Sequence, residues 1–219
     1  MKIYPTILTD SIAVCQQQVR EVSSVAEIET VQIDVIDGHY VDNLTVTPAD
    51  LVEVNFFDLS LDFHLMVEEP LNHLYEILEF KDQLPARAVI AQIERMTCQS
   101  EFIKDVKKNG LKPGLSLDLF TPLEALDYET WNSELEVIQL MAVEAGHQGQ
   151  EMQPLLFEKL QKLKRLMQEY SVNWEIVVDG GVKITNVKRL EEAGVEAVSV
   201  GSQIWRAEDK ERVIQKLAL

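Results

Sequence analysis

The chain has 219 residues, of which 46% are hydrophobic and 26% are charged, and this is enough apolar material for one globular domain with a sizeable core. Its 37 acidic and 20 basic residues give a net charge of −17 at pH 7, spread along the sequence, which argues against nucleic acid or an anionic membrane as a partner. The two cysteines form no metal or redox motif, no apolar run approaches a membrane span, and the start MKIYPTILTD lacks the apolar core of a signal peptide, so we expect a cytoplasmic protein.

Short apolar runs recur along the chain and are separated by longer segments with many polar residues. We predict a β-strand for each of eight runs, at residues 3–8, 31–36, 59–67, 86–93, 111–119, 135–143, 174–180 and 195–201. The spacing leaves room for one helix between most pairs of strands.

The segments between the runs carry apolar residues at helical spacing. From Ile12 to Val22, and again from Leu156 to Tyr170, an apolar side chain recurs every third or fourth residue and so lies on one helix face. Thr185 is placed to cap the helix after the seventh run, and Gly194 is placed to end it.

Alternating strands and helices predict a parallel sheet. Eight such units in a chain of this length favour an α/β fold, a single (β/α)8 TIM barrel that takes in residues 1–219. An open, doubly wound sheet is the alternative. The absence of a GxGxxG or GxxxxGKS motif after the first run weakens the nucleotide-binding form of that alternative.

Polar residues stand at the ends of several predicted strands, where a TIM barrel has its active site. Gln32 and Asp34 are two residues apart in one run and therefore share a face of the strand. His64 lies in the next run, and Asp179 ends the seventh, just before two glycines. If these faces point inward, Asp34, His64 and Asp179 meet at one mouth of the barrel.

Several of these segments together resemble a known family. DVIDGHYVDN, LDFHLMVEEP, MAVEAGHQGQ, VVDGGVKITN and VGSQI are similar, in this order, to the signatures of the ribulose-phosphate 3-epimerase family and its sugar-phosphate epimerase relatives. The resemblance runs from residue 5 to residue 205, nearly the whole chain. It implies a TIM barrel and an isomerase that interconverts D-ribulose 5-phosphate and D-xylulose 5-phosphate, or a close ketose phosphate.

The resemblance also implies a catalytic and metal site. In the family, two aspartates transfer protons through an enediolate and, with two histidines, bind a divalent metal; the aspartates match Asp34 and Asp179, and one histidine matches His64. The position of the other histidine holds Gln32, a neutral and weaker metal ligand. Two carboxylates and one imidazole favour Mn, Fe(II) or Mg over Zn. The alternative is a site without metal, in which Gln32 donates its amide N–H to the enediolate oxygen.

Substrate binding is the remaining element that the resemblance implies. The family binds phosphate through backbone N–H groups of glycine-rich loops, which suits an acidic protein. The residues that match its phosphate- and substrate-binding positions are Thr6, Gly146, Gly149, Gly180, Gly181, Gly201 and Ser202, and those that match its pocket lining are Ile36, Met66 and Met141.

Two further departures from the family pattern bear on the substrate and the activity. A GFGGQ-like loop appears here as GHQGQ, and Gln92 stands where the family has a histidine two residues before the glutamate matched by Glu94. Gln32 and Gln92 each stand in place of a family histidine. These two replacements keep open the alternative that the protein is a non-catalytic relative that binds a phosphosugar. A related keto-sugar-phosphate lyase or decarboxylase is disfavoured, because its relatives use a lysine that LDFHLMVEEP lacks. The sequence leaves open whether copies of the chain associate.

Overall fold

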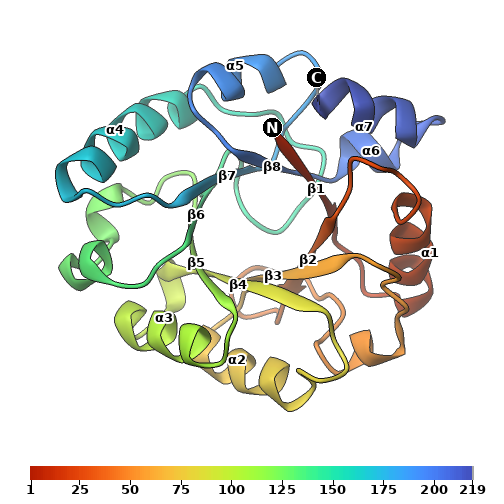
Figure 1. Cartoon of the computed structure of the whole chain (residues 1–219), viewed down its shortest axis with the longest axis horizontal. Helices are drawn as coiled ribbons and strands as arrows, with labels where there is room; N and C mark the ends of the chain where they lie inside the picture. Colours follow the sequence, from red (N-terminus) through yellow and green to blue (C-terminus); the bar gives the residue numbers. More distant parts are fainter. Residues whose placement is uncertain (219) are drawn as a thin grey trace.

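Eight parallel strands close into a barrel in the computed structural model, which describes residues 1–218 (Figure 1). Each strand pairs with its neighbours in the sequence, and β1 pairs with β8 to close the ring. The strands are β1 (Lys2–Ile7), β2 (Thr30–Ile36), β3 (Ser60–Met66), β4 (Ala86–Gln92), β5 (Lys112–Leu117), β6 (Val137–Met141), β7 (Glu175–Asp179) and β8 (Ala197–Val200). Each lies within the predicted run or differs from it by one residue at an end, so the predicted TIM barrel is confirmed and the open sheet is excluded.

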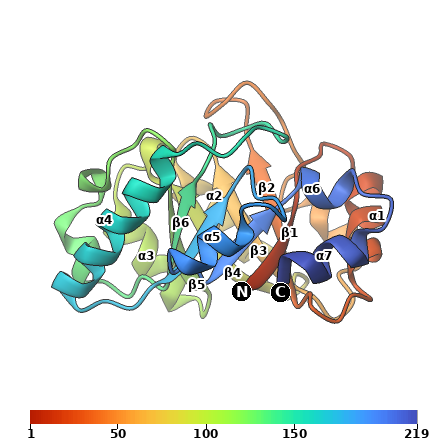
Figure 2. The ribbon, with the colours of Figure 1, turned by 90° about the horizontal axis from the view of Figure 1, so that it is seen from above.

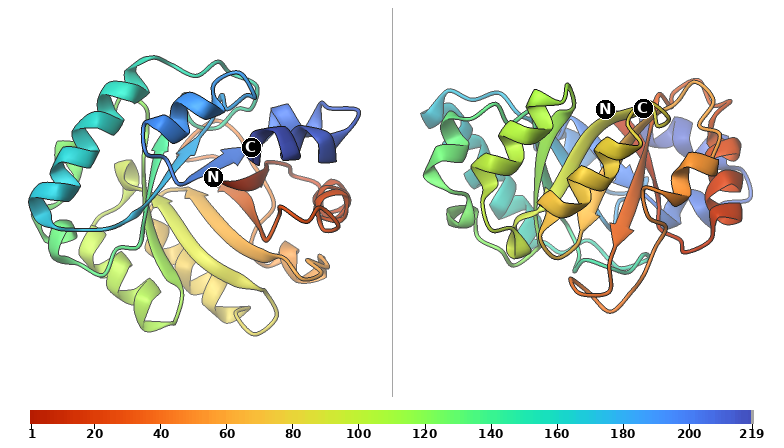
Figure 3. Two further views of the ribbon diagram at one scale, coloured as in Figure 1. Left: turned by 45° about the horizontal axis from the view of Figure 1, so that its top comes forward. Right: turned by 90° about the horizontal axis from the view of Figure 1, so that it is seen from below.

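A ring of helices surrounds the barrel (Figures 1 and 3). The helices are α1 (Ile12–Val22), α2 (Pro70–Glu79), α3 (Gln99–Lys108), α4 (Leu155–Tyr170), α5 (Val187–Glu192), α6 (Ser202–Trp205) and α7 (Lys210–Ala218). The crossovers after β2 and β5 contain only short 3₁₀ helices, which agrees with a helix between most, but not all, pairs of strands. Pro48 and Pro122 stand just before the first 3₁₀ helix of each crossover, at positions where proline is compatible with a helix start.

The predicted apolar helix faces pack against the sheet. Cys15, Val19 and Val22 of α1 are buried, as are most of the periodic residues of α4. The predicted cap at Thr185 is wrong, because α5 begins after Asn186, whose side chain instead bonds the turn before the helix. Gly194 follows the end of α5 with φ of +86°, as predicted for a residue that ends a helix.

Side chains fill the interior of the barrel, so it is a packed core and not a channel. The interior holds an apolar cluster of Tyr4, Ala88, Ile90, Val137, Val177 and Ala197. Above them, at the carboxyl ends of the strands, the interior becomes polar. Figure 2 shows the loops after β2 and β6 rising on this side of the barrel, away from both chain termini.

None of the helices within residues 1–218 combines the length and apolar character needed to cross a bilayer.

Candidate active site

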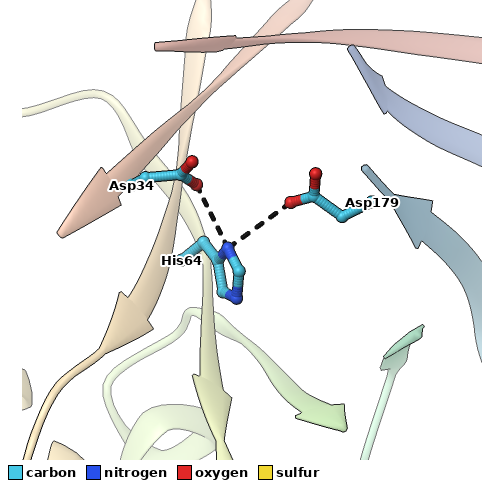
Figure 4. Close-up of side chains that lie close together, drawn as sticks. All are labelled: Asp34, His64 and Asp179. Atoms are coloured by element: carbon cyan, nitrogen blue, oxygen red, sulfur yellow. Dashed lines mark hydrogen bonds and ion pairs between the residues drawn. The ribbon is translucent and has the colours of Figure 1, made fainter. Parts of the chain in front are cut away.

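Asp34, His64 and Asp179 meet at the carboxyl-terminal mouth of the barrel, as the strand pattern predicts (Figure 4). Asp34 and His64 are directly paired in the register of β2 and β3, and Asp179 is the last residue of β7. His64 Nδ1 lies 3.1 Å from Asp34 Oδ1 and 3.5 Å from Asp179 Oδ2. All three residues are buried, and one ligand atom from each lies within 4.8 Å of the others.

Gln32 lies two residues before Asp34 on the same face of β2, and its side chain donates hydrogen bonds to both carboxylates. Its amide nitrogen Nε2 donates to Asp34 Oδ1 at 3.0 Å and to Asp179 Oδ2 at 2.7 Å. Its oxygen Oε1 accepts a hydrogen bond of 2.7 Å from the hydroxyl of Ser199 on β8. Ser199 therefore orients the amide so that its donor end faces the acids.

Two more glutamines complete the hydrogen-bonding network. Gln139 Nε2, from β6, donates to Asp179 Oδ2 at 3.2 Å. With its amide oxygen toward the imidazole, Gln92 at the end of β4 accepts from His64 Nε2 at 3.2 Å, while its nitrogen donates to Glu94 at 3.0 Å. A hydrogen bond at the far ring nitrogen fixes how His64 presents Nδ1 to the acids.

Ser199 and Gln139 are site residues that the sequence reasoning missed. The only signal was a polar side chain at an inward position of an apolar strand, the same signal that marked Gln32.

Burial and charge shift the pKa values of this cluster. Burial raises the pKa of Asp34 to about 6, and the charge of Asp179 adds to it, while hydrogen bonds from His64 and Gln32 oppose the shift. Burial would lower the pKa of His64, but its hydrogen bonds to Asp179 and Asp34 outweigh this and raise the pKa to about 9. His64 therefore holds its proton near neutral pH, and two carboxyl side chains share this one cationic partner.

The donor set of the cluster fits a divalent cation. Two carboxylates and one imidazole converge from three strands, and their excess negative charge favours a positive ion among them. The amide nitrogen of Gln32 faces the same oxygens, so the amide must turn before its oxygen can act as a ligand. Ser199 permits either orientation, because a hydroxyl both donates and accepts hydrogen bonds.

A cavity of about 50 Å³ leads to the acids, and the predicted substrate-binding residues line it. They are Thr6, Gly146, Gly149, Gly180, Gly181, Gly201 and Ser202, together with Asp34, Asp179, Met66 and Met141. Ile36 packs with both methionines and does not itself line the cavity. Gly181 has φ of +64°, and a Cβ there would lie 2.4 Å from the backbone nitrogen of Met152, so only glycine fits this turn.

Comparisons with known proteins agree with the fold and with the family resemblance of the sequence. A sequence model of the ribulose-phosphate 3 epimerase family matches residues 2–205. Ribulose-phosphate 3-epimerase of Helicobacter pylori is 32% identical over 218 residues, which cover 99% of this chain and 96% of that protein. The same enzyme of Escherichia coli is 31% identical over 217 residues, which cover 98% of this chain and 93% of that protein.

A solved structure is similar in fold alone. The tryptophan synthase A-subunit from Pyrococcus furiosus superposes with a TM-score of 0.69 at 14% identity, covering 99% of this chain and 95% of that one.

Proposed function

The chain belongs to the ribulose-phosphate 3-epimerase family, a family of isomerases, and from this premise we propose that it interconverts D-ribulose 5-phosphate and D-xylulose 5-phosphate, or a close ketose phosphate. The observation that carries the proposal is the pair of buried carboxylates, Asp34 and Asp179, which face each other across His64 (Figure 4). Epimerisation next to a carbonyl needs two such groups, because the proton leaves one face of the substrate and returns to the other.

The two aspartates transfer the protons in this proposal. One carboxylate removes the proton from carbon 3, and the electron pair of the broken C–H bond forms the enediolate. The other, protonated, aspartate delivers a proton to the opposite face of the same carbon, and the carbonyl is restored. The roles of Asp34 and Asp179 exchange when the reaction runs in the reverse direction. The reaction needs one aspartate as the base and the other, protonated, as the acid at the same time.

The remaining side chains position the acids and protect the enediolate. Gln32 and His64 hold both carboxylates by hydrogen bonds and thereby fix the distance between them. Met66 and Met141, backed by Ile36, form an apolar wall that excludes water from the planar intermediate.

We propose that Asp34, His64 and Asp179 hold a divalent metal, with Gln32 as a further ligand through its amide oxygen after rotation. Mn, Fe(II) or Mg suits these ligands better than Zn, because carboxylate oxygens outnumber the imidazole. A divalent cation, when bound, supplies positive charge next to the developing enediolate oxygens.

The phosphate end of the substrate belongs, in this proposal, to the loops after β6, β7 and β8. The cavity is lined from these loops by Gly146, Gly149, Gly180, Gly181, Gly201 and Ser202, and from β1 by Thr6. Glycines let the backbone approach the ligand closely, so its N–H groups can donate to phosphate oxygens. The proposal keeps the cytoplasmic location expected from the sequence.

The test is conversion of D-ribulose 5-phosphate by protein treated with a chelator and then supplied with Mn, Fe(II), Mg or Zn singly. We expect xylulose 5-phosphate to form, with Mn, Fe(II) or Mg restoring more activity than Zn. Folded protein that binds the sugar phosphate but converts none with any of the four metals is instead a phosphosugar-binding relative.

A further inference from the structure

A phosphate dianion approaching this site meets an acidic protein. The cavity of about 50 Å³ that leads to the acids is called the inner cavity. Its charged carboxyl side chains are Asp34, Glu144 and Asp179, and neither Lys nor Arg is among its lining residues in the described chain. Backbone N–H groups offer partial charges only. With a net charge of −17, a full positive charge near the phosphate end would therefore add markedly to substrate affinity.

A second cavity adjoins the inner one and is lined by positively charged side chains. It has a volume of about 230 Å³ and shares Gly149, Gln150, Gly181, Val182 and Ser202 with the inner cavity. Since the inner cavity of about 50 Å³ has room for only a few water molecules, a five-carbon sugar phosphate that reaches the acids extends toward this second cavity. Its basic lining residues are Lys183 and Arg206.

The two basic residues differ in their partners. Lys183 Nζ pairs with Glu151 at 3.2 Å, so its charge is already partly neutralised. Arg206 follows directly on α6 and forms no ion pair within residues 1–218. Its guanidinium lies over the backbone of Gly149, where a Cβ would be 2.7 Å from Arg206 Nη2. The guanidinium of Arg206 therefore contacts the loop that contains Gly149, whose backbone the phosphate would contact.

We infer that Arg206 binds the phosphate group of the substrate and supplies the positive charge that the inner cavity lacks; this rests on the proposed function. The planar guanidinium can give two parallel hydrogen bonds to phosphate oxygens, which a lysine cannot. Arg206 therefore determines the specificity for a phosphorylated over an unphosphorylated sugar. It takes no part in the proton transfers, because it lines the second cavity and not the one that contains Asp34 and Asp179.

The test compares Arg206→Gln and Arg206→Lys with Arg212→Gln, a matched control that removes the same charge from an exposed position on α7. Affinity for inorganic phosphate and for D-ribulose 5-phosphate is measured by calorimetry at low and high salt, alongside KM and kcat. For Arg206→Gln we expect about tenfold weaker binding of both ligands and a matching rise in KM at unchanged kcat, with a smaller difference at high salt. Arg206→Lys should bind with intermediate affinity, and Arg212→Gln as wild type.

The outcomes separate this inference from the proposed function, because inorganic phosphate binds without turnover. Binding of D-ribulose 5-phosphate that depends on Arg206 but leads to no conversion supports the inference and refutes the epimerase. Equal affinities of the Arg206→Gln and Arg212→Gln variants for both ligands overturn the inference, whatever the turnover.

Discussion

Two polar clusters lie inside the same barrel, at opposite ends, and their charges are balanced differently. At the amino-terminal end, Arg87 donates two hydrogen bonds to the buried carboxylate of Asp62 and stacks over the ring of Tyr4. Glu175 accepts from Lys2 at 2.7 Å and from the Tyr4 hydroxyl at 2.8 Å. Two acids thus meet two bases, and the cluster is neutral within itself.

The cluster at the other end has no such balance. Asp34 and Asp179 share one imidazole, and the remaining partners are neutral amides and a hydroxyl. Buried charge is costly unless it is paired, so an arrangement that leaves it unpaired needs another reason to exist. A buried acid alone therefore does not indicate a functional site, whereas buried acids that outnumber their basic partners at the mouth of a barrel do.

The largest effect should come from neutralising one of the acids at the mouth. Asp179→Asn keeps the shape and the hydrogen-bonding reach of the side chain but removes the proton-transfer group, so kcat should fall by about 10²- to 10⁴-fold. Steady-state conversion of D-ribulose 5-phosphate measures it, and Asp34→Asn should behave alike. A variant that keeps more than half of the wild-type kcat would remove Asp179 from the mechanism.

The same change at the opposite end should affect stability and not catalysis. Asp62→Asn removes the closer of the two carboxylates that pair with the partly buried Arg87, the other being Glu175 at 3.9 Å, and breaking such a pair costs about 3 kcal/mol. Urea unfolding measures the loss, while kcat of the folded variant should stay within about twofold of wild type. Loss of activity in Asp62→Asn at unchanged stability would contradict the assignment of a structural role to the amino-terminal cluster.

The pH dependence of stability should also distinguish the cluster at the mouth from the cluster at the amino-terminal end of the barrel. With metal removed by chelation, the folded protein holds a proton on His64 up to about pH 9, whereas the unfolded chain releases it near 6.5. This contribution is fully present below pH 6.5 and is lost as the pH rises through 9; at ~1.4 kcal/mol per pKa unit it amounts to about 3 kcal/mol.

Unfolding free energies measured at several pH values between 6 and 10 test this expectation. Wild type should lose stability over the window, and His64→Gln should lose much less. Parallel curves for the two proteins would contradict the raised pKa.

The smallest expected effect concerns the metal. Gln32→His replaces an amide that donates to both carboxylates by an imidazole that can bind a cation, so affinity for Mn²⁺ should rise at least about tenfold. Calorimetric titration of the chelated protein measures it, with Gln139→His as a control at a glutamine that contacts Asp179 only. Unchanged affinity in Gln32→His would mean that the site does not take a metal through this position.

Much of this arrangement follows from the sequence, because strands have a period of two. Spacing places Gln32 and Asp34 on one face of their strand, and the positions of His64 and Asp179 near strand ends predict that the two acids and the imidazole meet if these faces point inward. The structure confirms that meeting. The two crossovers without an α-helix could not be predicted, since their prolines and polar residues are compatible with several loop structures.

Other features depend on residues far apart in the chain. Ser199 lies in an ordinary apolar run, and only the closed barrel brings its hydroxyl to Gln32 on β2. Likewise, nothing near Arg206 in the sequence shows that its guanidinium lies over Gly149. Side-chain orientation set by partners from several strands is what a single sequence does not reveal.

The most direct test of the two-aspartate mechanism is the fate of the proton on carbon 3. Wild-type protein converts D-ribulose 5-phosphate in deuterium oxide, and NMR follows carbon 3 of the product from the first turnovers. Because the second aspartate exchanges its proton with solvent, every molecule of xylulose 5-phosphate should carry deuterium at that carbon, and neither single Asp→Asn variant should form it at a comparable rate. Product that retains the original hydrogen would contradict proton transfer by Asp34 and Asp179.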